Sequence, residues 1–183
     1  MALINETLRE IHFKIVYAGP AQGGKLSNMK AFCKLVTGLQ LGYMNSVSIS
    51  LGSISDYKID ALLLPLPDIA DLATARIYLK GADGVVFVAD SQSDRLEACV
   101  EALESLQRIL REPGAEKPDM PVVLQYNKRD LPNAAPIAEV RSRLNLHQIP
   151  EIEASTKLGH GVLDSLKLVV KQCLVQLRDG QKK

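Results

Sequence analysis

The sequence predicts an α/β fold, a three-layer sandwich in which a mostly parallel central sheet carries helices on both faces. Short apolar runs of strand type alternate with longer segments of helical periodicity along the 183 residues. Residues 85–89 are continuously apolar, as expected of a central strand that is buried on both faces. A chain of this length fits one domain, so we expect residues 1–183 to form a single domain with residues 178–183 as a flexible tail.

The first half of the chain supplies three expected strands and one helix. Residues 11–17 form an apolar first strand, which runs directly into a glycine-rich turn. This turn starts a helix over residues 25–36, and residues 46–50 and 58–66 are expected to be the next two strands.

The second half continues the alternation of strands and helices. After the strand at residues 85–89, Ser93 or Asp94 is expected to cap a helix. One face of this helix is apolar at i, i+3, i+4 spacing and consists of Leu96, Cys99, Val100, Leu103, Leu106 and Leu110. A loop is expected next, at the residues Pro113, Gly114, Pro118 and Pro121. The remaining elements are strands at 122–126 and 149–154 and helices at 138–144 and 162–177.

Composition narrows the classes of partner. The 22 basic and 21 acidic side chains nearly cancel, which argues against a nucleic-acid-binding surface built on bulk positive charge. Cys33, Cys99 and Cys173 lie far apart in helical stretches, so we expect free, buried thiols in a reducing cytosol. No apolar run approaches the roughly 20 residues that span a bilayer, and no signal-peptide pattern is present. We therefore expect a cytoplasmic protein without direct membrane insertion, whose partner is a nucleotide or a protein.

The glycine-rich turn matches a phosphate-binding loop, Gly-x-x-x-x-Gly-Lys. Successive backbone N–H groups in such a loop point into a concavity at a helix N-terminus, where the helix dipole favours phosphate. Lys25 would pair with the β- and γ-phosphates. The alternative is an accidental glycine-rich turn. The candidate phosphate-binding residues are Gly19, Gln22, Gly23, Gly24, Lys25, Leu26 and Ser27.

A second motif, Asn127-Lys128-Arg129-Asp130, follows the strand at residues 122–126. A carboxylate accepts hydrogen bonds from the N1–H and the exocyclic amine of guanine, an edge that adenine does not present. Asp130 is the expected acceptor, Asn127 would bind the O6/N7 side and brace the phosphate loop, and the methylenes of Lys128 would cover the ring. The alternative is a solvated charged turn, but its place at a strand end after a phosphate loop favours guanine recognition.

With both motifs in place, the chain resembles the small Ras-like GTPases, and more closely the bacterial MglA type that controls cell polarity, gliding and type IV pili. The resemblance extends over nearly the whole length and is carried by residues 13–17, 19–20, 28–30, 80–91 and 125–132. The run Gly-Ala-Asp-Gly-Val-Val-Phe-Val-Ala-Asp-Ser within it is distinctive of that type.

The resemblance implies a Ras-like P-loop NTPase fold and a guanine nucleotide, GDP or GTP, as the cofactor. It places residues 153–157 at the family's last base-binding loop, which adds Ser155 and Thr156 to the guanine-binding candidates. It also implies protein partners, among them Roadblock/LC7-type proteins and proteins of polarity or pilus systems. Such partners would recruit the chain to a cell pole or to the inner membrane.

Departures from the family pattern bear on catalysis. Leu26 replaces the hydroxyl residue that ligates Mg²⁺, and Ser27 points about 100° further round the helix, so Mg²⁺ is a doubtful cofactor. Residues 64–69 replace a segment whose glycine senses the γ-phosphate and whose glutamine orients the attacking water. Asp68 in this segment would repel a triphosphate, so we expect GDP to be favoured over GTP. The stand-ins for the switch threonine are Ser48, Ser50, Ser53 and Ser55, among which the sequence does not decide.

We therefore expect a regulatory GTPase-like protein of the MglA type, acting in cell polarity, gliding or type IV pilus motility, with little or no GTP hydrolysis. No catalytic residue and no metal ligand is assigned, since the histidines share no metal-ligand spacing. One alternative is a slow GTPase that is completed by a partner, or by Ser27 and a switch serine. Another is a nucleotide-free scaffold. Residues 127–130 argue against a third class, a P-loop kinase.

Overall fold

The computed structural model describes residues 2–36, 38–68, 71–112, 117 and 119–180. Its strands are β1 (Leu3–Asn5), β2 (Glu10–Ala18), β3 (Val47–Ile54), β4 (Tyr57–Pro65), β5 (Gly84–Asp90), β6 (Val122–Asn127) and β7 (Glu151–Glu153). Its helices are α1 (Lys25–Leu35), α2 (Leu72–Leu79), α3 (Leu96–Leu110), α4 (Ile137–Leu144) and α5 (Val162–Gly180), with short 3₁₀ turns η1 (Tyr43–Asn45) and η2 (Ser93–Arg95). Every strand and helix that the sequence predicts is present. β1 and α2 were not predicted from the sequence.

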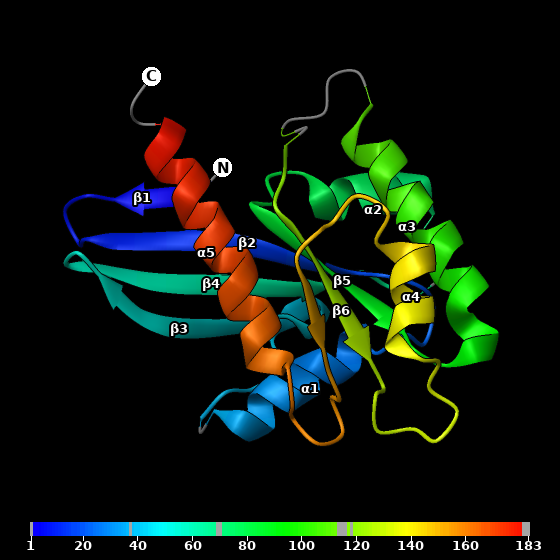
Figure 1. Ribbon diagram of the computed structural model, residues 1–183. Coiled ribbons are helices and arrows are strands. Elements are labelled where there is room, and N and C mark those ends of the chain that lie inside the picture. Colours follow the sequence, from blue (N-terminus) through cyan, green and yellow to red (C-terminus); the bar gives the residue numbers. More distant parts are fainter. Residues whose placement is uncertain (1, 37, 69–70, 113–116, 118, 181–183) are drawn as a thin grey trace.

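The strands join into a sheet that is mostly parallel, as predicted (Figure 1). Their order is β3-β4-β2-β5-β6-β7, and β1 pairs with β2 off this path. β2 runs parallel to β4 and β5, and β6 runs parallel to β5 and β7. β3 and β1 are antiparallel to β4 and β2, so the antiparallel pairs lie on the side of the sheet formed by the first half of the chain.

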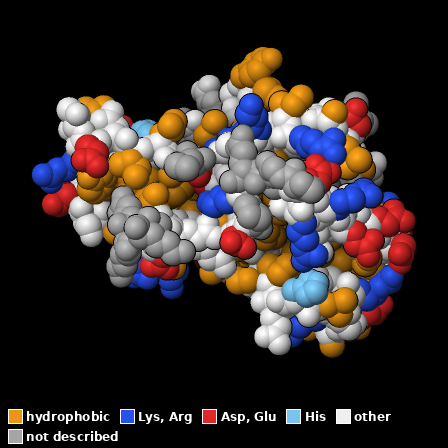
Figure 2. Space-filling view, turned by 90° about the horizontal axis from the view of Figure 1, so that it is seen from above, with side chains coloured by type: hydrophobic (Ala, Val, Ile, Leu, Met, Phe, Trp, Pro, Cys, Tyr) orange, Lys and Arg blue, Asp and Glu red, His pale blue; other side chains and the backbone are white. Residues whose placement is uncertain are grey.

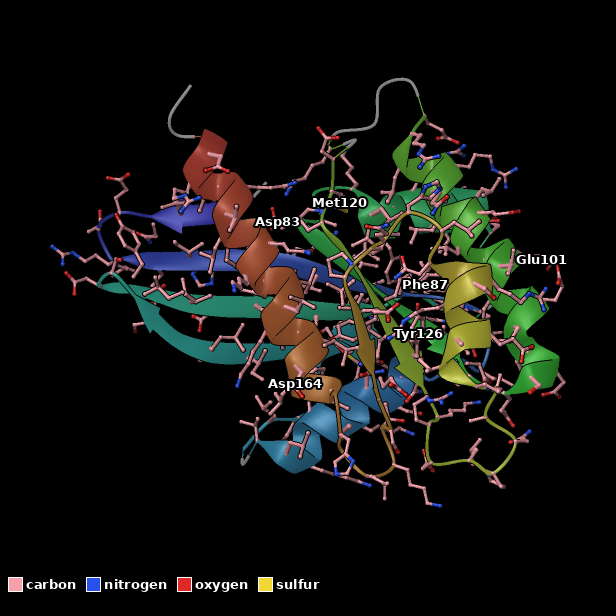
Figure 3. The ribbon with its side chains drawn as sticks, viewed as in Figure 1. Asp83, Phe87, Glu101, Met120, Tyr126 and Asp164 are labelled. Atoms are coloured by element: carbon pink, nitrogen blue, oxygen red, sulfur yellow. The ribbon has the colours of Figure 1, made fainter. Side chains whose placement is uncertain are left out.

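Each face of the sheet has its own apolar core, because side chains along a strand alternate between the faces. Ile15 of β2 packs with residues of α1 and α5, whereas its neighbour Val16 packs with residues of α2, α3 and α4. Figure 1 shows α5 lying across the strands with α1 beside its first turns. Phe87 of β5 and Tyr126 of β6, labelled in Figure 3, belong to the second core. These two cores complete the three-layer sandwich.

The carboxyl ends of the central strands meet at one edge of the sheet. Ala18 of β2 pairs with Phe87 of β5, and Asp90 of β5 pairs with Asn127 of β6. Ligands of open α/β sheets bind outside this edge. The glycine-rich loop after β2 and the motif that starts at the end of β6 therefore lie on the same side of the sheet.

The predicted cap of α3 was wrong. A 3₁₀ turn, η2, precedes the helix, so the N-cap residue is Arg95 and no side chain caps it. The N–H of Arg95 donates to the carbonyl of Gln92 at 2.9 Å, which tightens the chain before the helix begins. Ser93 and Asp94 lie inside this turn and not at the helix end.

Two expectations concern segments that lie partly outside the described residues. Residues 178–183 were expected to be a flexible tail, but α5 continues to Gly180, and residues 181–183 lie outside the described residues. Of the expected loop residues, Pro113, Gly114 and Pro118 also lie outside them.

Charges of both signs share the surface. Figure 2, seen from above, shows Lys and Arg side chains interspersed with Asp and Glu over that face. Ion pairs such as Arg76 with Glu112 (2.6 Å) and Arg129 with Glu153 (3.0 Å) join neighbouring elements. Within the described part of the chain, none of the helices combines the length and the apolar character needed to span a bilayer.

A buried polar network joins α1, β6 and α5. Asn28 and Gln125 exchange two side-chain hydrogen bonds of 2.8 and 3.0 Å, and Gln125 donates another to the hydroxyl of Ser165 at 3.1 Å. Asn28 also donates to the carbonyl of Gly24, and Ser165 to that of Gly161. All three side chains are fully buried. Because buried amides need partners, this network holds the start of α1 and the start of α5 to β6.

Replacing Gln125 with Leu should lower the free energy of unfolding by about 1–3 kcal/mol, because the amide of Asn28 then loses buried partners. Urea denaturation followed by circular dichroism measures the change. The double variant Asn28→Leu/Gln125→Leu removes both amides and should recover most of the loss. A single variant as stable as the unmodified chain would show that the network contributes little.

Candidate functional site

Residues 19–24 form the loop between β2 and α1 that the sequence identifies as a phosphate-binding loop. Gly19 and Gly24 adopt φ angles of +137° and +111°, which side chains strongly disfavour. A Cβ on Gly19 would also overlap with the carbonyl oxygen of Val88, and one on Gly24 with the side-chain nitrogen of Asn127. The loop leads straight into α1, whose first N–H groups have no partner within the helix. The shape of the loop therefore depends on glycine, and backbone N–H donors at the start of α1 have no partner within the helix.

Three groups of this chain contact the ammonium group of Lys25. Its side chain is only 2% exposed, and its Nζ lies 2.7 Å from Oδ1 of Asp68. The same nitrogen lies 3.0 Å from the carbonyl oxygen of Gly19 and 2.7 Å from that of Pro20. A lysine ammonium has three N–H donors, and three acceptors surround it here. The second oxygen of Asp68 accepts a hydrogen bond of 2.9 Å from the backbone N–H of Gln22.

These contacts keep Asp68 ionised. Partial burial by itself raises the pKa of a carboxyl group, but the hydrogen bonds from Lys25 and from the Gln22 N–H, together with the charge of Lys25, lower the pKa of Asp68 below its usual value. The sequence places Asp68 near the γ-phosphate position. Its direct bond to Lys25 was not predicted, because no local pattern indicates it.

A cavity of about 500 Å³ opens beside this loop. Much of its lining is apolar and comes from Leu26, Met44, Pro65, Leu66, Pro67 and Tyr78. Lys25, Ser27 and Asp68 line it as well. The serines considered for the switch position lie instead on β3 or in the turn after it, and none lines the cavity: Ser48, Ser50, Ser53 and Ser55. Among the described residues, no three His, Cys, Asp or Glu side chains come together as a metal site.

Asn127 joins the phosphate loop to the last loop of the site. Its Nδ2 donates to the carbonyl of Gly23 at 3.0 Å, and its Oδ1 accepts from the backbone N–H of Thr156 at 3.1 Å. The residue is 1% exposed. The sequence assigns Asn127 a bracing role toward the phosphate loop, and this contact is present. The bond to Thr156 brings in the loop that was assigned only through the family resemblance.

Asp130 and Ser155 form the other polar pair of this region. The hydroxyl of Ser155 donates to Oδ1 of Asp130 at 2.6 Å and accepts from the N–H of Leu158 at 3.2 Å. The hydrogen bond from Ser155 lowers the pKa of Asp130, with a smaller contribution from the charge of Lys157. At neutral pH Asp130 is therefore a carboxylate whose orientation is set by the neighbouring loop.

Lys128 is anchored by a residue that the sequence did not single out for this purpose. Its Nζ lies 2.6 Å from Oδ2 of Asp90, a side chain that is 1% exposed. Asp90 also accepts from the backbone and the side chain of Gln92, and Arg95 lies 3.9 Å away. Arg95 in turn donates to the carbonyl of Ala21 at the tip of the phosphate loop, at 2.9 Å. The signal for Asp90 was an acidic residue at the end of an apolar strand, on the edge where α/β proteins bind ligands, although a helix cap would explain such a residue as well.

Gly24→Ala should lower the free energy of unfolding by about 1–3 kcal/mol more than Gly52→Ala. Both glycines have positive φ, +111° and +92°, so both variants strain the backbone, but a Cβ on Gly52 meets nothing within 4 Å. The difference between the two losses in unfolding free energy therefore reports the overlap of the new Cβ with Asn127. Urea denaturation of both variants measures it. Equal losses in the two variants would contradict the close approach of Asn127 to the loop.

Comparison with known proteins shows the family of the chain. The model of the ADP-ribosylation factor (Arf) family matches residues 73–182 of the chain. The chain is 41% identical to the mutual gliding-motility protein MglA of Myxococcus xanthus (strain DK1622), over an alignment of 194 residues that covers 98% of this chain and 100% of the relative. The first match spans more than half of the chain and the second nearly all of it. This chain therefore belongs to the MglA-type small Ras-like GTPases.

Proposed function

We propose that this chain is a regulatory protein that binds guanine nucleotide and hydrolyses GTP little or not at all. The proposal rests on a contrast between the base side and the phosphate side of the site. On the base side, Asn127, Asp130 and their partner loop are held by mutual hydrogen bonds. On the phosphate side, Leu26 stands at the position that needs a metal ligand, and Asp68 is bonded to the phosphate-loop lysine.

The guanine ring would lie against the turn at residues 127–130. The ionised Asp130 supplies the acceptor for the N1–H and the exocyclic amine of guanine, and Ser155 keeps that carboxylate oriented. Asn127 uses its amide on the two neighbouring loops, so it acts mainly by bracing the walls of the pocket. The stem of Lys128 would cover the ring while Asp90 holds its ammonium group.

The phosphates would lie against the backbone N–H groups at the start of α1, from Gly23 to Ser27. Hydrolysis needs a bridging metal ion and a positioned water. Leu26 offers no ligand atom, and Ser27, the next residue, is exposed on the helix. The segment from Pro65 to Asp68 contains neither glycine nor glutamine for the γ-phosphate and the water. These losses support binding without efficient turnover.

In the cell, the proposed role is to recruit protein partners in gliding, cell polarity or type IV pilus motility. The name of the relative from M. xanthus describes a gliding-motility protein. Tyr43 (88% exposed) and Ile77 (70% exposed) are neighbours of the cavity residues Met44 and Tyr78. Their exposed apolar side chains suit a protein partner, for which we propose a Roadblock/LC7-type protein. Such a partner would bring the chain to a cell pole or to the inner membrane.

Isothermal titration calorimetry on the nucleotide-stripped protein tests the proposal. We expect GDP and GTP to bind and ATP not to bind, with affinities that change little between Mg²⁺ and EDTA and without phosphate release. Leu26→Thr restores a hydroxyl and should make GTP binding depend on Mg²⁺. Turnover with Mg²⁺ in the unmodified chain would instead favour a slow GTPase. A chain that binds none of the three nucleotides would be a scaffold.

Asp130→Asn should weaken GDP binding by about tenfold or more, because the loss of even one of the two hydrogen bonds to this charged acceptor lowers the affinity by about that much. Xanthosine diphosphate, which carries a carbonyl in place of the exocyclic amine, should bind the variant better than the unmodified chain. Asp164→Asn, at an exposed position of α5 (Figure 3), is the matched control and should change neither affinity. An unchanged preference for guanine in Asp130→Asn would place the base elsewhere.

A further inference from the structure

The segment that follows β4 places the carboxylate of Asp68 against the phosphate loop. Both oxygens of Asp68 are bound there, one to Nζ of Lys25 at 2.7 Å and the other to the N–H of Gln22 at 2.9 Å. A backbone N–H of a glycine-rich loop and the loop lysine are the donors that such a loop offers to phosphate. Asp68 therefore uses donors of the kind that bind a phosphate group.

The lysine has no further donor for an incoming ligand. Its three N–H groups face Gly19, Pro20 and Asp68, and its side chain is almost completely buried. The two carbonyl contacts belong to the loop itself. Asp68 is the one partner of the three that sits on another segment, and its side chain is 47% exposed. A phosphate that binds Lys25 directly would have to take the place of Asp68.

The path of the chain explains why Asp68 reaches this position. The N–H of Leu66 donates to the carbonyl of Tyr17 at 2.8 Å, which ties the segment to the end of β2, next to the phosphate loop. Pro65 and Pro67 restrict the backbone on either side of Leu66. A short and conformationally restricted segment therefore holds the carboxylate of Asp68 beside the phosphate loop.

We propose that Asp68 is an internal ligand of the phosphate loop that selects nucleoside diphosphates over triphosphates. The inference rests on the proposed guanine-nucleotide site and names the residue that sets its selectivity. The proposal replaces the pairing of Lys25 with the β-phosphate that the sequence pattern predicts: the terminal phosphate of a diphosphate uses the N–H groups in the first turn of α1 while Asp68 stays on Lys25. A third phosphate must enter the space of the carboxylate and meets its negative charge.

Calorimetry in EDTA with GDP and GTP tests this selectivity in Asp68→Asn. The variant should bind GTP about tenfold or more tightly than the unmodified chain does, with a smaller change for GDP. Asp71→Asn is the matched control: it removes the same charge three positions along the chain, where Asp71 accepts from the N–H of Thr74 and does not contact the loop. Asparagine caps a helix about as well as aspartate, so the control should change neither affinity. An unchanged ratio of GTP to GDP affinity in Asp68→Asn would overturn the inference.

A second measurement does not depend on nucleotide. Carbon-detected NMR titration of the Asp68 carboxyl group should show a pKa below the ordinary value, and Lys25→Met should return the pKa toward it, because the partner charge is gone. An ordinary pKa in the unmodified chain would overturn the internal ligand. A lowered pKa in a chain that binds no nucleotide would support the bond to Lys25 and refute only the proposed nucleotide site and its selectivity.

Discussion

One buried side chain, that of Asn127, holds the ligand-binding edge of the sheet together. It donates to the phosphate loop at Gly23 and accepts from the last loop at Thr156, so segments from the beginning, middle and end of the chain meet on one amide. Because the amide is almost completely buried, both hydrogen bonds have to be made in the folded state. The same amide leaves no room for a Cβ on Gly24, which connects the glycine of one motif to the asparagine of the other.

Asp90 organises the same loops from the end of the neighbouring strand. A buried carboxylate needs a cation, and Asp90 has Lys128 at 2.6 Å with Arg95 at 3.9 Å. Arg95 then reaches the carbonyl of Ala21 in the phosphate loop. The base motif and the tip of the phosphate loop are therefore linked through one acidic residue as well as through Asn127. Beneath them, the reciprocal amide pair of Asn28 and Gln125 supports the start of α1.

The two sides of the site differ in what their polar groups bind. On the base side, Asp130 is oriented by Ser155. On the phosphate side, Lys25 is surrounded by acceptors from its own chain, among them Asp68. Such internal pairing satisfies a buried ammonium without a ligand. In the function proposed above, this GTPase fold keeps its architecture and the candidate base-recognition motif, while Leu26 and Asp68 stand where phosphate chemistry needs other groups.

Most strands and helices and the positions of both motifs could be predicted from the sequence, because apolar periodicity and glycine spacing are local properties, whereas β1 and α2 were missed. The parallel topology then implied that the motifs meet at one edge, and the predicted contact of Asn127 with the phosphate loop is present. The partners of the charged groups could not be predicted in this way. A lysine side chain is flexible, so its sequence position does not indicate which group its ammonium contacts. In the structure, β5 packs beside β6 and places Asp90 next to Lys128. Likewise, the bond between Asp68 and Lys25 exists only because β4 and β2 are neighbours and the chain after β4 turns toward the loop. A pattern of residue types records which groups are charged, whereas the distance between two charges is decided by the tertiary packing of the segments that carry them.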